Sequence, residues 1–197
     1  MKFKPLSPTP NATWFWLMLG LMLWQPSLQA APKQDWHHQA TIRYAAEDNQ
    51  IFVDPESAAK LKRYHNQYLR EPMYEDYLYV VLLTLLGEQE FQGLFKNLGG
   101  GFVPIQVREP FLIMKGTRDH CGGLQEGLIM VDTTTGHVFT ARYAVDQFYI
   151  ATTTDAATPL PSYLERWVLR ILNANGPREK PSRNKVLLQK MAGDWCL

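Results

Sequence analysis

The most reactive side chains of this sequence lie together in one short segment. Residues 118–123 read Arg-Asp-His-Cys-Gly-Gly and fall in a predicted turn between two strands. A cysteine near a histidine is the pair that cysteine proteases use as nucleophile and base. Adjacent residues of an extended chain point their side chains apart, however, and no nucleophile motif surrounds Cys121. The sequence therefore disfavours cysteine catalysis, and we predict that the protein is not an enzyme.

The same segment contributes to a set of possible metal ligands. The spacing of these side chains matches no zinc-binding pattern, so we expect neither a metal ion nor another cofactor. An alternative interpretation of the segment is purely structural, because Gly122 and Gly123 allow the unusual backbone angles of a tight turn. The possible ligands are His37, His38, His120, Cys121 and His137.

The overall charge indicates no class of partner. The chain of 197 residues has 20 Lys and Arg against 19 Asp and Glu, a formal net charge of +1. A nucleic-acid-binding protein needs a positive field that collects phosphates, so we expect no nucleic-acid partner. Hydrophobic residues make up 46% of the chain, which is typical of a folded globular protein.

The first thirty residues have the pattern of a signal peptide. Two lysines precede the apolar run Trp14–Trp24, and small residues follow at Ala30 and Ala31, beyond Pro26. The apolar run is too short to cross a hydrocarbon core of about 30 Å as a helix. A retained membrane anchor is the alternative. We expect residues 1–30 to be removed, leaving an exported protein in the periplasm or outside the cell, with no membrane span.

Both cysteines lie in the expected mature chain. An exported protein meets oxidising conditions, under which two thiols usually pair, so a disulfide between Cys121 and Cys196 is predicted. Free or intermolecular cysteines are the alternative interpretation. The predicted bridge would tether the basic tail, residues 174–197, to the reactive segment.

Hydrophobic periodicity predicts one α+β domain over residues 54–173. An irregular arm, with room for one short strand, precedes it over residues 31–53. Within this domain the spacing of the hydrophobic residues is helical up to about residue 101 and alternates, as in strands, after it. We expect a central antiparallel sheet of four or five strands, flanked by amino-terminal helices and one carboxy-terminal helix. The predicted helices are 54–70, 72–86, 88–98 and 162–173, and the predicted strands are 102–107, 111–117, 127–132, 137–143 and 147–153.

The stretch Phe91–Tyr143 resembles the periplasmic inhibitor of vertebrate lysozyme (Ivy) family. In that family a strand enters a protruding loop of the form Cys-Lys-Pro-His-Asp-Cys. Here Phe111–Lys115 is similar to the entering strand, Gly116–Cys121 occupies the loop, and Leu128–Asp132 is similar to the next strand. The resemblance implies a central antiparallel sheet flanked by helices. It also implies a loop that plugs the active-site cleft of c-type lysozymes with its histidine.

The loop differs from the family pattern at two points. The family's first loop cysteine falls on Gly116, so the small disulfide within the loop cannot form. The order of histidine and aspartate is also reversed, in Asp119-His120. Cys121 matches the second loop cysteine, and Cys196 is then its only candidate partner in the chain.

The resemblance implies a role for each polar residue of the loop. His120 would donate a hydrogen bond to a carboxylate of the lysozyme, and Arg118 would add a charge-assisted contact. Asp119 and Gly122 would shape the loop. We therefore expect an exported binding protein that inhibits a c-type lysozyme, with a lysozyme-like muramidase as its protein partner. The alternative is a periplasmic interaction or assembly module that has an inhibitor-like fold, does not inhibit lysozyme and docks through residues 54–98.

Overall fold

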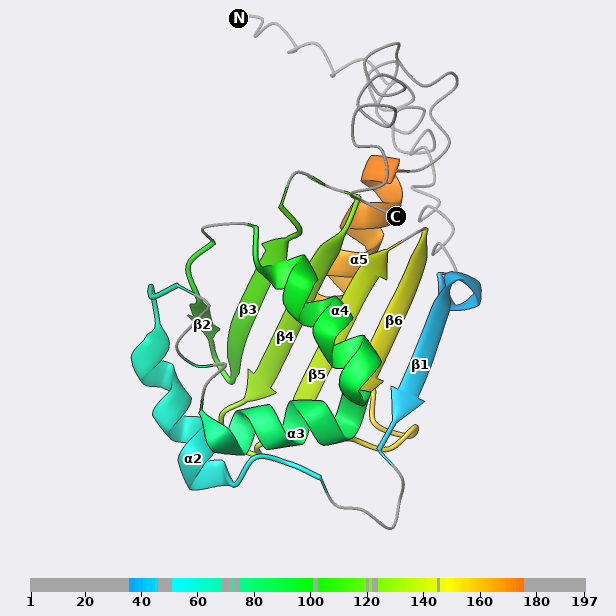
Figure 1. Ribbon diagram of the computed structural model, residues 1–197. Helices are drawn as coiled ribbons and strands as arrows, with labels where there is room; N and C mark the ends of the chain where they lie inside the picture. The colour runs from blue at the N-terminus through cyan, green and yellow to red at the C-terminus, as the bar shows by residue number, and fades with distance from the viewer. Residues whose placement is uncertain are drawn as a thin grey trace, which may run out of the picture. The chain divides into compact units, whose positions relative to one another are not determined.

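A six-stranded sheet with helices on both faces forms the centre of the protein (Figure 1). The strands lie in the order β1-β6-β5-β4-β3-β2, and all neighbours are antiparallel except β1 and β6, which are parallel. The computed structural model describes residues 36–45, 51–68, 72, 75–100, 103–119, 121, 124–144 and 146–175. The strands are β1 (Ala40–Tyr44), β2 (Gln106–Arg108), β3 (Phe111–Thr117), β4 (Glu126–Asp132), β5 (Val138–Ala144) and β6 (Gln147–Thr152).

The sheet confirms the α+β class and corrects the expected strand arrangement. Four or five antiparallel strands were predicted, whereas the sheet has six strands and is mixed. The additional strand is β1, which falls in the predicted irregular arm, where the sequence left room for one short strand. It pairs with β6 in the register Ala40 with Phe148, more than one hundred residues apart in the chain. So distant a partner leaves no local signal, so the sequence did not predict that this strand joins the sheet or that it pairs in parallel.

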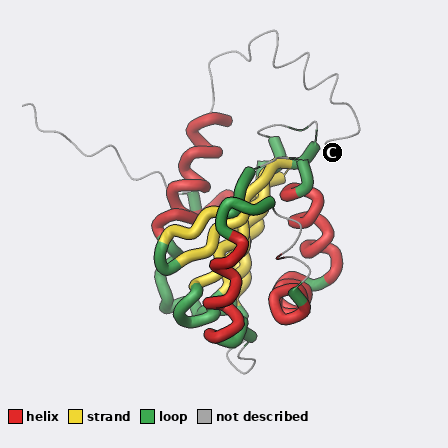
Figure 2. The backbone as a smooth tube through the Cα atoms, turned by 90° about the vertical axis from the view of Figure 1, so that its left-hand side faces the viewer, coloured by secondary structure: helices red, strands yellow, loops and turns green. Residues whose placement is uncertain are grey.

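Two apolar clusters fix the layers of the fold. Leu112 and Met114 of β3 face the helices that precede the sheet, whereas Ile113 between them faces α5 (Ser162–Asn175). Figure 2 shows the strands between helices on either side. Because β3 and β4 are covered on both faces, their apolar residues run consecutively instead of alternating with polar ones. The helices on the first face are α2 (Pro55–Lys60), α3 (Asp76–Leu86) and α4 (Glu88–Leu98), with the 3-10 helix η2 (Leu61–Tyr64) after α2.

The start of α2 is confirmed, but its predicted length is wrong. Asp54 caps the helix by accepting a hydrogen bond from the backbone N–H of Ser57 at 2.8 Å. The predicted helix to about residue 70 ends instead with η2, and Asn66 has a left-handed φ of 63°. The chain turns there because its backbone bonds to the segment that leads into β2: Asn66 N–H donates to the carbonyl of Ile105, and Ile105 N–H donates to the carbonyl of Gln67.

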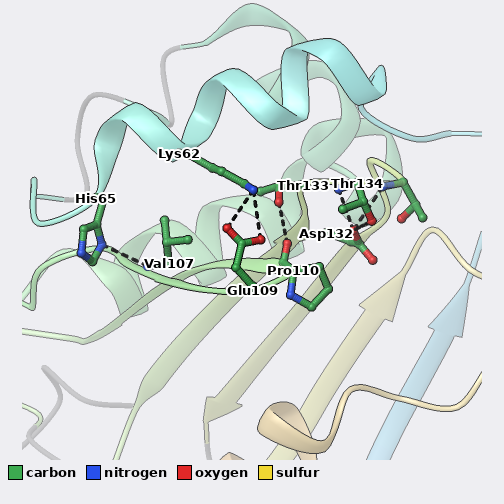
Figure 3. A network of polar contacts seen from close by, with 9 residues as sticks. Lys62, His65, Val107, Glu109, Pro110, Asp132, Thr133 and Thr134 are labelled. Carbon is green, nitrogen blue, oxygen red and sulfur yellow. Dashed lines mark hydrogen bonds and ion pairs between the residues drawn. The ribbon is translucent and has the colours of Figure 1, made fainter.

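The edge of the sheet at β2 is covered by a polar network (Figure 3). The backbone N–H of Val107 donates to Nδ1 of His65 at 3.1 Å, and Lys62 binds both carboxylate oxygens of Glu109. The His65 ring therefore takes the place of a neighbouring strand for one N–H of β2. Such cover protects an edge strand from pairing with other chains.

The predicted signal peptide, residues 1–30, lies outside the described residues, as does most of the predicted basic tail. Within the described part of the chain, no helix combines the length and the apolar character that a membrane crossing needs.

Candidate binding loop

The reactive segment lies in the connection between β3 and β4, at one end of the sheet. The two strands pair over their whole lengths, and the last pairs before the loop are Gly116 with Gly127 and Thr117 with Glu126. Seven residues of each strand are paired in this way. A long ladder of this kind gives the loop a fixed base, because both of its ends are held in register.

Arg118 and Gln125 close the loop with a pair of hydrogen bonds. The backbone N–H of Arg118 donates to the carbonyl of Gln125 at 3.1 Å, and Nη1 of Arg118 donates to the side-chain Oε1 of Gln125 at 3.0 Å. Two further backbone bonds fold the tip. Cys121 N–H donates to the carbonyl of Arg118, and Leu124 N–H donates to the carbonyl of Cys121. The described part of the loop is therefore a sequence of tight turns.

The predicted site residues have different surroundings in the loop. Asp119 is exposed, Arg118 is half-buried against Gln125, and Cys121 is 2% exposed. His120 and Gly122 lie outside the described residues, so their roles stay predictions. Cys196 also lies outside them, and the disulfide between Cys121 and Cys196 stays a prediction.

The carboxy-terminal end of α4 supports the base of the loop, which the sequence analysis did not predict. The backbone N–H of Gly100 donates to the carbonyl of Thr117 at 2.7 Å. Nδ2 of Asn97, a residue only 1% exposed, donates to the carbonyl of Glu126 at 3.2 Å and to that of Tyr143 at 3.0 Å. The available signal was a polar residue, Asn97, on the otherwise apolar face of a predicted helix.

On the opposite face of the sheet, α5 holds the first residue of β4. Nη1 of Arg170 donates to Oε1 of Glu126 at 3.2 Å, and Nη2 of Arg170 binds the other carboxylate oxygen. Glu126 is a buried acid, 8% exposed, so this partner compensates a charge that would otherwise be costly to bury. Helices on both faces of the sheet therefore hold the strand that leaves the loop.

A second polar cluster ties η2 to the start of α3. The hydroxyl of Tyr64 and the guanidinium of Arg63 both donate to the carboxylate of Glu75. The hydrogen bond from Tyr64 is the main cause that lowers the pKa of Glu75, and burial raises the pKa of Tyr64. Every charged group of this cluster has a partner, which fits a structural tie between two helices.

The outer surfaces of α3 and α4 carry exposed apolar side chains. Val80 is 57% exposed, Tyr79 39% and Phe95 36%. Phe91 lies between the two rings, with its centroid 5.1 Å from that of Tyr79 and 6.1 Å from that of Phe95. The exposed side of α3 thus includes the apolar side chains of Tyr79 and Val80 beside the polar Asp76 and Thr84.

No protein family, no curated protein and no solved structure matches this chain.

Proposed function

We propose that this protein is an exported, non-catalytic inhibitor that inserts the loop Gly116–Gly123 into the active-site cleft of a c-type lysozyme-like muramidase. The observation that carries the proposal is the closed base of the loop, where Arg118 and Gln125 are joined through both backbone and side chains. A loop whose ends are fixed before binding loses less conformational entropy when it enters a cleft. Preordering of this kind is what a plug requires.

The side chains of the loop suit an acidic cleft. Glycosidases of this type place two carboxyl groups on either side of the bond that they cleave. Arg118 has five N–H donors, so its hydrogen bond to Gln125 leaves donors for a carboxylate of the enzyme. In this proposal His120 donates to a second acceptor in the cleft, while the exposed Asp119 stays at the rim, where it avoids the enzyme's own carboxylates.

Inhibition by occupation of a cleft needs no chemical step by the inhibitor. The proposal therefore assigns no catalytic residue and no cofactor to this chain. It places the protein in the periplasm or outside the cell, where a muramidase would attack the cell wall.

The test is a titration of the exported, oxidised protein into c-type, g-type and i-type lysozymes that hydrolyse cell-wall substrate. We expect saturable inhibition of a c-type enzyme and a large loss of inhibition in His120→Ala. His38→Ala is the matched control, because His38 is an exposed histidine in the 3-10 helix η1 (His37–Gln39), which precedes β1. Absence of inhibition at micromolar protein, or equal inhibition by His120→Ala and the wild type, would contradict the proposal.

The exposed apolar surface of α3 and α4 favours a second candidate, a periplasmic interaction or assembly module. Surface helices usually turn a polar face to solvent, whereas α3 presents Tyr79 and Val80. In this function a crosslinker at Thr84, an exposed residue of α3, captures a specific partner, Val80→Asp abolishes the capture, and lysozyme activity is unaffected by the protein. A crosslinker at Gln92, an exposed polar residue of α4, is the control.

A further inference from the structure

The segment that follows α4 lies directly on the backbone of the β3–β4 loop. A Cβ atom added to Gly100 would lie 2.2 Å from the backbone N of Asp119 and 2.6 Å from the backbone C of Arg118. Real Cβ atoms do not come so close to backbone atoms, so no side chain fits at position 100 with the loop in this place. The contact is therefore one backbone against another, reinforced by the hydrogen bond from Gly100 N–H to Thr117.

A second close contact lies just before the loop. A Cβ atom added to Gly116 would lie 2.6 Å from the carbonyl oxygen of Leu98 and 2.9 Å from its Cα. Position 116 is in β3 and Leu98 is the last residue of α4. The end of the helix thus touches the chain at the base of the loop, and Gly100, two residues after the helix end, touches the chain inside the loop.

The end of α4 is itself held in place. The two hydrogen bonds of Asn97 reach the backbone of β4 at Glu126 and of β5 at Tyr143. These acceptors belong to two neighbouring strands. A shift of the helix end along the sheet would therefore break both hydrogen bonds. Buried hydrogen bonds of this kind are costly to leave unmade.

We propose that the segment Asn97–Gly100 is the positioning element of the binding loop, and that Gly100 is its point of contact. It holds the backbone of Arg118 and Asp119 in the conformation that enters the cleft of the muramidase. The effect of this element on inhibition rests on the proposed function. Its effect on the geometry of the loop does not, and can be measured without any partner.

The test compares Gly100→Ala with Gly99→Ala. Among the described residues, a Cβ atom at Gly99 would meet only the carbonyl oxygens of Lys96 and Phe95, at 3.6 and 3.7 Å, which are ordinary contacts. The two variants carry the same chemical change at adjacent positions and restrict the unfolded chain in the same way. Neither glycine has a left-handed φ, so the two differ in the space around the new methyl group.

We expect Gly100→Ala to shift the amide resonances of Arg118 and Asp119 and to speed their exchange with solvent. We also expect it to weaken inhibition roughly tenfold, because the displaced loop must be reordered on binding. Gly99→Ala should leave the resonances, the exchange rates and the inhibition near those of the wild type. Loop amides that respond equally to both substitutions would overturn the inference, and so would a displaced loop that inhibits fully.

A measurement on the unmodified protein keeps the inference testable if Gly100→Ala does not fold. The amide hydrogen of Gly100 should exchange with solvent as slowly as that of Arg118, since both bond to the loop base. Exchange of the Gly100 amide at the rate of an unstructured peptide would overturn the inference. A protein that inhibits no lysozyme but protects both amides would refute the proposed function and leave the positioning element intact.

Discussion

The guanidinium of Arg118 donates a hydrogen bond to the side-chain oxygen of Gln125, 3.0 Å away, across the two ends of the β3–β4 loop. Gln125 is only 4% exposed, so this bond forms in a place with little access to water. The arginine that the family resemblance predicts as a contact residue is therefore also part of the closure of its own loop. A substitution at either residue should therefore change the conformation of the loop in the free protein, without any partner present.

Gln125→Met should open this closure while it preserves the volume of the side chain. We expect a loss of about 1 kcal/mol in the free energy of unfolding and faster exchange of the Arg118 amide, because one buried hydrogen bond is lost. Gln125→Glu keeps an acceptor for Arg118 and should restore most of the protection. Denaturant unfolding and amide exchange would measure both effects. Equal exchange rates in the two variants would show that the side-chain bond does not hold the loop.

Asn97→Ala should be strongly destabilising, because it removes both buried hydrogen bonds that hold the end of α4 to β4 and β5. The expected cost is about 2–4 kcal/mol in the free energy of unfolding. Gln92→Ala is the matched control on the same helix. Gln92 is exposed and bonds only to Glu88 among the described residues, so its removal should cost less than about 0.5 kcal/mol. Similar costs for the two substitutions would mean that Asn97 does not hold α4 to the sheet.

Gly116→Ala should destabilise the fold although alanine is normally tolerated better than glycine in a strand. The new methyl group would lie 2.6 Å from the carbonyl oxygen of Leu98, so α4 or β3 must move. We expect a cost of roughly 1–3 kcal/mol, typical of an overpacked core. Thermal unfolding of this variant and of Gly99→Ala, whose methyl group makes no such contact with the described residues, would check this. A Gly116→Ala protein as stable as the wild type would show that the helix end is free to shift.

The stability of the turn between β4 and β5 should depend on pH through Asp132 (Figure 3). Burial on its own would raise the pKa of Asp132. The hydrogen bonds that its carboxylate accepts from Thr134 and Thr135 outweigh burial and hold the pKa below the ordinary value of 3.8. The folded pKa is thus lower than the unfolded one. The stabilisation is then complete above the unfolded pKa and is lost as the pH falls through the folded pKa.

Unfolding measured between about pH 7 and pH 2 should therefore show a stability gap between the wild type and Asp132→Asn that closes in acid. Thr135→Ser is the control, because it keeps the backbone donor to Asp132 and should retain the pH dependence of the wild type. A gap that stays constant across this range would mean that the carboxylate is not specifically stabilised in the folded protein.

The helix α4 and the strand β3 show how much local sequence can determine. Both have the predicted bounds, Glu88–Leu98 and Phe111–Thr117. In α4 the apolar residues recur at helical spacing between Gly87 and Gly99, and in β3 a run of apolar residues ends at a turn. These signals lie within the element itself, so they need no knowledge of the rest of the chain. The cap at Asp54 was predictable for the same reason.

The loop segment was also identifiable from the sequence, since its arginine, aspartate, histidine and cysteine are adjacent. Its supporting contacts were not. Gly100 and Thr117 are 17 positions apart, and Asn97 and Tyr143 are 46 apart. A triple glycine after a helix predicts only where the helix stops. Whether one of those glycines lies against another backbone depends on how the helix packs on the sheet.

Sequence alone thus determined the types of the elements, most of their bounds and the place of the candidate loop, because each has a signal within a few neighbouring residues. The tertiary structure decided the parallel pairing of β1 with β6, the early turn at Asn66 and the support of the loop by Gly100. Each of these depends on a contact between residues far apart in the chain. Such a contact leaves no periodic pattern in either partner, and it forms only when the packed core brings the two backbones together.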